Sequence, residues 1–218
     1  MTALVNAAYR PAAIPAPSAD ASLFHLGLDG YRPTPVHDLP DLAAEIGVGD
    51  LRLKDESSRL GLPAFKILGA SWAIERALRE QPGVHTLVAA SAGNHGRAVA
   101  HEAARRGLTS RVFLPARAAR ARREAIAGEG AEVIVVDGTY EEAVARAQAE
   151  GEQPGALELA DVGDSGPAGW VIEGYATLFA EVAEQGSFDL VLVPIGVGSL
   201  GAAAARFGAA RGVPAVGA

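Results

Sequence analysis

The chain has 218 residues, a formal net charge of −7 and no cysteine. The absence of cysteine excludes disulfides, thiolate metal sites and thiol catalysis. The negative charge argues against nucleic-acid binding, and no apolar run is long enough to cross a bilayer. The first 18 residues lack the basic start and the apolar stretch of a secretory signal, so we expect a cytoplasmic protein with no membrane partner.

The first third of the chain predicts a tail, a short helix and a strand before a long helix. Residues 1–30 are rich in alanine and proline and predict a loose N-terminal tail. After the tail, prolines such as Pro33 and Pro35 and the glycine Gly47 limit the regular elements to short lengths. The elements expected here are an extended segment over 31–35, a helix over 41–46, a strand over 51–54 and a helix from 66 to about 80.

From residue 86 onward, strands and helices alternate, which predicts a parallel sheet covered by helices on both faces. Residues 163–169 carry three glycines and a proline and predict a linker or crossing loop. The expected strands are 86–90, 111–114, 133–136, 189–195 and 213–216, and the expected helices are 95–106, 118–127, 140–150 and 170–184.

Lys66 lies in the apolar stretch AFKILGA. A lysine kept away from water loses its proton more easily, and a neutral amine can act as a nucleophile toward carbonyls. The alternative is a helix that buries Phe65 and Ile67 while Lys66 extends to solvent.

Residues 196–201, GVGSLG, follow a predicted strand and precede an alanine-rich helix. Glycines let backbone amides approach an anion, and the positive end of the helix favours negative charge, so this loop predicts phosphate binding. A dinucleotide site also needs an acidic residue about twenty positions later, and residues 214–218 supply none. A glycine turn used only for tight packing stays an alternative.

Residues 91–96, SAGNHG, form a second polar loop between a strand and a helix. Loops at the carboxyl ends of parallel strands are where α/β proteins bind ligands. Asn94 offers a hydrogen-bond donor and an acceptor, and the amides near His95 could hold a carboxylate. Taken singly, Asn94 is also typical of a helix cap and His95 of a surface residue.

Together these motifs resemble the fold-type II pyridoxal-phosphate enzymes, and most of all the diaminopropionate ammonia-lyases. The similarity runs from about Tyr31 to the C-terminus. It is carried by KDES at 54–57, RLGLPAFKILG at 59–69, EGYATL at 173–178 and the strand followed by GVGSLG. The resemblance implies a two-domain α/β fold of parallel sheets with helices on both faces, with a large cofactor domain over 31–82 and 170–218 and a small domain over 83–169.

The resemblance also implies a pyridoxal 5'-phosphate cofactor and the residues that hold it. Lys66 would bind the cofactor covalently, beside Phe65, and Asn94 would bind its 3-hydroxyl. The substrate carboxylate would be held by Ser91, Gly93, Asn94 and His95, and the phosphate by Gly196, Val197, Gly198, Ser199 and Leu200. The implied reaction removes the α-proton and the β-substituent of a small amino acid and yields a keto acid and ammonia. The resemblance suggests a homodimer, and no metal is expected.

Three features depart from the resembled pattern: two residues and the length. Ala92 stands where the ammonia-lyases carry an acid, and an alanine cannot move a proton. By the resemblance, a second acid of the family corresponds to Glu158, whose longer side chain would act as acid or base; the alternative is a solvated charge at a strand end. The family members are also longer, so we expect an incomplete, C-terminally truncated large domain.

Two alternatives to this interpretation stay open. The chain could be a nicotinamide- or nucleotide-binding protein that uses GVGSLG, or a non-catalytic remnant of a pyridoxal-phosphate enzyme.

Overall fold

The structure is a computed structural model that describes residues 14–163 and 165–218. Its first described helix is α1 (Ala19–Leu26), followed by the antiparallel pair β1 (Val36–Asp38) and β2 (Arg52–Lys54) on either side of α2 (Pro40–Ile46). The long helix α3 (Lys66–Glu80) then leads into the sheet. The prediction of a loose tail over residues 1–30 is therefore wrong over 19–26, and its first 13 residues lie outside the described part.

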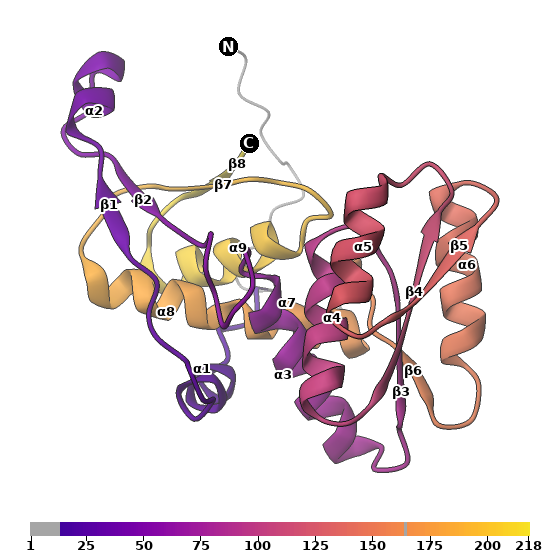
Figure 1. Ribbon diagram of the computed structural model, residues 1–218. Coiled ribbons are helices and arrows are strands. Elements are labelled where there is room, and N and C mark those ends of the chain that lie inside the picture. Colours follow the sequence, from indigo (N-terminus) through magenta and orange to yellow (C-terminus); the bar gives the residue numbers. More distant parts are fainter. Residues whose placement is uncertain (1–13, 164) are drawn as a thin grey trace.

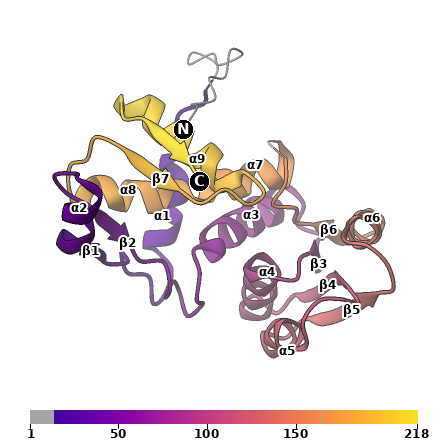
Figure 2. The same ribbon diagram turned by 90° about the horizontal axis from the view of Figure 1, so that it is seen from above.

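A four-stranded parallel sheet has the strand order β5-β4-β3-β6. Its strands are β3 (Thr86–Ala90), β4 (Thr109–Pro115), β5 (Glu132–Val136) and β6 (Ala156–Glu158). Helices α4 (Asn94–Arg105) and α5 (Arg120–Gly128) cover one face and α6 (Tyr140–Gly151) covers the other, as Figures 1 and 2 show. The predicted parallel sheet with helices on both faces is confirmed.

The rest of the chain returns to α3. Helix α7 (Gly166–Gly174) crosses α3, α8 (Ala176–Gln185) continues from it, and β7 (Val191–Val193) leads into α9 (Ser199–Arg211) and β8 (Ala215–Gly217). Helix α7 begins inside the segment predicted as a crossing loop over 163–169, so that prediction is wrong from residue 166 onward. The single helix expected over 170–184 is divided at Tyr175.

The largest apolar core joins the four-stranded sheet to the part of the structure built on α3, α7, α8 and α9. It contains residues of α3, α4, β3, α7, α8 and α9 in one continuous cluster. Smaller clusters fill the space between the four-stranded sheet and α6 and between the sheet and α5. The division into a small domain over 83–169 and a large domain stays a prediction, although the four-stranded sheet lies within that range.

Candidate active site

Lys66 is the first residue of α3 and follows a tight turn in which Arg59 and Leu62 exchange two backbone hydrogen bonds. Its amine donates a hydrogen bond of 2.8 Å to Oδ2 of Asp161. The amine also lies 5.7 Å from the centre of the Phe65 ring and 5.6 Å from the centre of the Tyr175 ring. The aromatic surroundings agree with an amine partly shielded from water, and the structure adds an anionic partner that the sequence had not indicated.

Asp161 follows β6 and reaches the Lys66 amine from the carboxyl edge of the sheet. Burial alone would raise the pKa of Asp161, but the nearby His95 ring, the charge of Lys66 and the hydrogen bond from Lys66 bring it below its ordinary value. Tyr140 stands at the same edge, where its hydroxyl donates to the carbonyl of Ala90 at 3.2 Å. Asp161 is therefore an ionised carboxylate in direct contact with the amine.

His95 is buried beside this pair. Its Nε2 lies 2.6 Å from the carbonyl oxygen of Leu159, and because a carbonyl can only accept, Nε2 carries the proton. Burial lowers the pKa of His95, so the ring is neutral near pH 7. Its Nδ1 has no hydrogen-bond partner among the described residues and lies 4.0 Å from Oδ2 of Asp161. Within the described part of the chain, this buried nitrogen is left as an unused hydrogen-bond acceptor beside Asp161.

The loop over residues 91–94 lies between β3 and the start of α4. The Ser91 hydroxyl accepts from the Gly93 amide at 3.2 Å, while Asn94 is exposed at the first position of the helix. A side chain at Gly96 would come within 2.8 Å of the Ser91 carbonyl oxygen, so this position needs glycine. The loop therefore places the predicted substrate-binding residues Ser91, Gly93 and Asn94 next to His95.

The glycine loop over 196–200 connects β7 to α9, and Gly198 has the left-handed backbone (φ 96°) that ends the turn. The Ser199 hydroxyl is buried with no hydrogen-bond partner in the described ranges, as is the hydroxyl of Tyr175. Burial raises the pKa of Tyr175 well above its ordinary value, so the phenol keeps its proton. The two hydroxyls lie close enough for Ser199 to act on the pKa of Tyr175, and both stand beside the start of α9, where a helix favours an anion.

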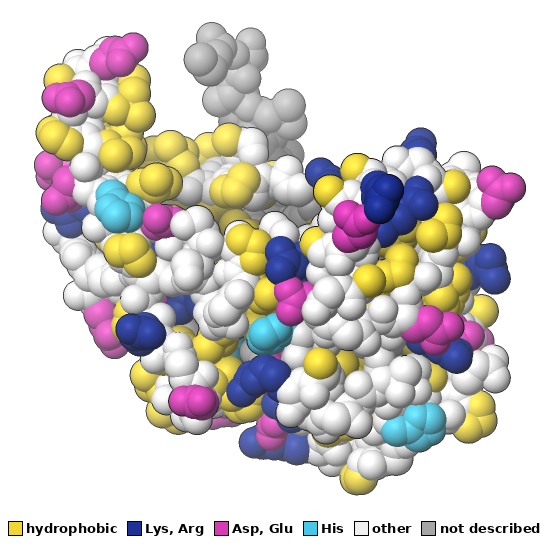
Figure 3. Space-filling view, viewed as in Figure 1, with side chains coloured by type: hydrophobic (Ala, Val, Ile, Leu, Met, Phe, Trp, Pro, Cys, Tyr) yellow, Lys and Arg dark blue, Asp and Glu magenta, His cyan; other side chains and the backbone are white. Residues whose placement is uncertain are grey.

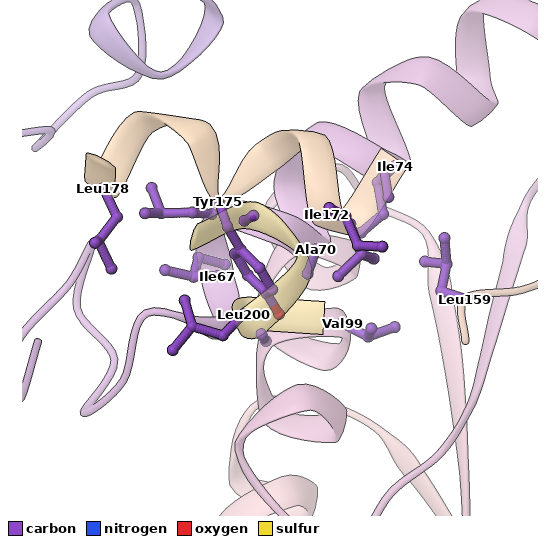
Figure 4. Packing of buried hydrophobic residues seen from close by; sticks show 14 of the residues in the cluster. Ile67, Ala70, Ile74, Val99, Leu159, Ile172, Tyr175, Leu178 and Leu200 are labelled. Carbon is purple, nitrogen blue, oxygen red and sulfur yellow. The ribbon is translucent and has the colours of Figure 1, made fainter. Parts of the chain in front are cut away.

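Tyr175 links the glycine loop to the lysine. Its ring packs edge-on against Phe65 with the centres 5.0 Å apart, and it shares the main core cluster with Ile67 and Leu200. Figure 4 shows the Tyr175 side chain directed toward Leu200, with Ile67 beside it. Tyr175 therefore lies between the Lys66 amine and Ser199 at the start of α9.

Glu158 lies on the α6 side of the sheet, where its charge acts on Tyr140 and burial raises its own pKa above the ordinary value. Side chains along β6 alternate, so that Leu157 joins the core with α3 and α4 while Ala156 packs against the α6 side of the sheet. Glu158 lies on the same side as Ala156, where a side chain at Gly151 of α6 would come within 2.7 Å of its Cβ. The carboxylate that contacts Lys66 is Asp161, and the acid or base role of Glu158 stays a prediction.

Three site residues were missed by sequence reasoning: Asp161, Tyr140 and Tyr175. Asp161 and Tyr140 follow strands at the carboxyl edge of the sheet, a position that favours ligand contact. The signal was weak because β6 has three residues. Among the described residues, no group of three or more His, Asp or Glu is placed to hold a metal. No helix in the described ranges is long and apolar enough to span a membrane.

Known proteins of this fold are similar over most of the chain. The diaminopropionate ammonia-lyase of Escherichia coli K12 is 37% identical over 186 residues, which cover 76% of this chain and 46% of that protein. The threonine dehydratase IlvA of Salmonella typhimurium is 32% identical over 173 residues, or 79% of this chain and 32% of that protein. The chain thus spans about half, or less, of the length of the curated relatives it matches.

Solved structures give the same result. The apo form of the Escherichia coli diaminopropionate ammonia-lyase superposes with a TM-score of 0.84 and 34% identity, covering 90% of this chain and 61% of that one. Maize serine racemase superposes with a TM-score of 0.80 and 27% identity, covering 94% and 61%. These neighbours have the fold-type II architecture that the sequence predicted. The family model described as "Pyridoxal-phosphate dependent enzyme" matches residues 28–217, and the chain belongs to that family.

Proposed function

We propose that the chain is the cofactor-binding part of an ammonia-lyase that converts a small amino acid of the diaminopropionate type into a keto acid and ammonia. The observation that carries the proposal is the 2.8 Å contact between the Lys66 amine and Asp161, at a site that also holds buried hydroxyls without partners. The diaminopropionate ammonia-lyases among the relatives support the substrate class.

The residues present fit pyridoxal phosphate. Lys66 would hold its aldehyde, and the unpartnered Ser199 hydroxyl and the amides of the glycine loop would hold its phosphate. Asn94 is exposed at the start of α4, where its amide can reach a ligand hydroxyl. When bound, the cofactor supplies an electron sink for the charge that develops on the substrate's α-carbon.

The chain's own residues would supply binding and proton transfer. The Ser91 hydroxyl, the Gly93 amide and the unpartnered Nδ1 of His95 line the position for the substrate's polar groups. Asp161 is placed to take a proton from Nζ of Lys66 and to return it, because the two atoms already share a hydrogen bond. Lys66 would act as the base toward the α-proton, and Glu158 has no part in this scheme.

Covalent trapping tests the cofactor assignment. The sequence has only two lysines, Lys54 and Lys66, so a borohydride-reduced adduct can be assigned by mass spectrometry without ambiguity among side chains. We expect the adduct on the Lys66 peptide, its loss in Lys66→Ala and its retention in the matched control Lys54→Arg. Labelling that persists in Lys66→Ala, or that sits on Lys54, would contradict the assignment.

Product analysis tests the reaction. We expect ammonia and pyruvate from 2,3-diaminopropionate, and a loss of about 10²–10⁴ in turnover in Asp161→Asn, while Glu158→Gln stays near the unmodified chain. The same protein preparations are also incubated with L-serine, and the D-serine formed is measured. Racemisation is the second candidate reaction, suggested by the similarity to maize serine racemase. Racemisation without ammonia would replace the lyase proposal, and a trapped cofactor with neither product would identify a non-catalytic chain.

A further inference from the structure

Helix α1 carries a buried histidine that the proposed function does not use. His25 is fully buried although its neighbours Leu23 and Leu26 are exposed. It lies before residue 28, where the match to the family model begins. Its helix packs against α3 and α8, the two helices that begin next to Lys66 and Tyr175.

Three groups from two helices surround the His25 ring. Nε2 lies 3.0 Å from the carbonyl oxygen of Leu68 and 3.1 Å from the hydroxyl of Ser71, and Nδ1 lies 2.7 Å from the hydroxyl of Thr177. The carbonyl can only accept, so Nε2 carries the proton, and Nδ1 accepts from the Thr177 hydroxyl. Burial lowers the pKa of His25 to about 4, which keeps this neutral form at physiological pH.

The His25 ring is hydrogen-bonded to α3 at a place where α3 and α7 are in close contact. A side chain at Gly174 would come within 2.4 Å of the Leu68 carbonyl oxygen, and one at Gly69 within 2.7 Å of the Tyr175 ring. The carbonyl that accepts from His25 therefore lies at the contact between the two helices. Leu68 is two residues after Lys66, and Thr177 is two residues after Tyr175.

We propose that His25 is a positioning residue: its neutral ring ties the first turn of α3 to the start of α8 and so fixes the Lys66 amine against Asp161 and Tyr175. The inference rests on the proposed function only in taking Lys66 as the reacting amine. His25 touches neither Lys66 nor Asp161, and it acts through the Leu68 carbonyl and the Thr177 hydroxyl.

Helix α1 has other contacts that hold it in place when the ring is changed. Phe24 packs against Trp72 with the ring centres 5.6 Å apart, and the Arg106 guanidinium lies 6.0 Å from the centre of the Phe24 ring. A substitution at His25 therefore removes the hydrogen bonds and leaves these aromatic contacts of α1. His25→Phe retains an aromatic ring of similar size and has no polar atom.

The experiment measures how fast the Lys66 amine of the full chain, without cofactor, reacts with acetic anhydride across a range of pH. Added Nα-acetyl-lysine is the reference, because Lys54 is held by Glu181 of α8, a helix that packs against α1, and would not report independently of His25. We expect His25→Phe to raise the Lys66 rate relative to this reference by about three- to tenfold, the effect of one lost hydrogen bond, because a looser α3 exposes the amine. His25→Gln, which can still donate to the Leu68 carbonyl, returns the rate toward that of the unmodified chain.

Two further variants keep the test decisive. Thr177→Val removes the partner of Nδ1, together with the weaker 3.3 Å contact between Thr177 and Ser22 of the same helix α1. It is expected to change the rate in the same direction by a smaller factor, which decides the matter if His25→Phe does not fold. His85→Gln changes an exposed histidine at the start of β3 and serves as the control with no change. An unchanged or lower Lys66 rate in folded His25→Phe or Thr177→Val overturns the proposal. Because no cofactor is added, this outcome is independent of the trapping experiment.

Discussion

The four-stranded sheet and the part of the molecule built on α3, α8 and β7 are held together by different interactions. The sheet has helices on both faces and a dry interior that includes Leu87, Val88 and Leu114. The other part has two short strand pairs and a buried ion-pair network around Arg59 and Glu181. Figure 3 shows that it also carries hydrophobic side chains on its surface, on α2 and along the segment with β7.

The ion-pair network gives two residues of the KDES segment, Lys54 and Glu56, a structural role. The Arg59 guanidinium is fully buried and binds Glu56 and Glu181, and Lys54 donates to Glu181 at 2.6 Å. Burial would raise the pKa of Glu181, but its bonds to Arg59, Lys54 and Tyr31 lower it to about 2. Apolar packing tolerates acid, whereas this network depends on ionised carboxylates, so the two parts should respond differently to the same perturbation.

The largest effect is expected when the network loses one partner. Glu181→Gln leaves the buried Arg59 without its main counter-charge and should lower the free energy of unfolding by about 3–5 kcal/mol. Glu80→Gln, which breaks the exposed pair with Arg76, is the matched control and should cost less than about 1 kcal/mol. Urea titration measures both, and equal effects would show that the network adds little.

A core substitution tests the sheet in the same way. Leu87→Ala removes a fully buried side chain from β3 and should cost about 2–5 kcal/mol through lost packing and the cavity left behind. Leu192→Ala in β7, where the side chain is 60% exposed, should change stability by less than about 0.5 kcal/mol. A large loss at Leu192 would mean that β7 is covered in solution.

Acid should weaken the part around α1 first. The pKa of His25 falls from about 6.5 in the unfolded chain to about 4 in the folded chain, so the unfolded state takes up its proton at the higher pH. Its contribution is fully present above pH 6.5 and is lost as the pH falls to 4, about 3 kcal/mol in all. Unfolding free energies between pH 7 and 4 should fall less steeply in His25→Phe, and equal slopes would count against the buried neutral ring.

A substitution on the exposed strand pair β7–β8 is expected to have the smallest effect on the free energy of unfolding and a measurable effect on self-association. Among the described residues, β7 and β8 pair only with each other, and Leu192, Ile195 and Val216 are exposed on or beside them. Unpaired edges with apolar side chains favour self-association. Sedimentation should show less association for Val216→Lys, with Thr109→Lys, an exposed position at the start of β4, as the control.

Much of the fold could be predicted from local signals. The turn at residues 81–83 ends α3, and the capping box of Thr139 and Glu142 starts α6, so both helices are read from the sequence. Helix α1 was missed because its apolar residues Leu23 and Leu26 face solvent and a histidine faces the core. The division between α7 and α8 lies next to the close contact of Gly174 with α3, which local pattern does not reveal.

The candidate site was predictable where glycines and turns mark it and less so where a single side chain arrives from a distant strand. Lys66, the Ser91 to His95 loop and the glycine loop each carry a recognisable local pattern. Asp161 carries none, because its role depends on which strand lies next to β3. Glu158 shows the same difficulty, because it ends a three-residue strand while the carboxylate that contacts Lys66 is Asp161, beyond that strand.

The strand order has a consequence for the order of folding. Thr86 of β3 pairs with Thr109 of β4 nearby in sequence but also with Ala156 of β6, far along the chain. Contacts that close long loops form late because the loop entropy is lost before the contact is gained. We therefore expect the segment that carries Asp161 to dock after β3, β4 and β5 have assembled, so that the lysine acquires its carboxylate partner in one of the last steps.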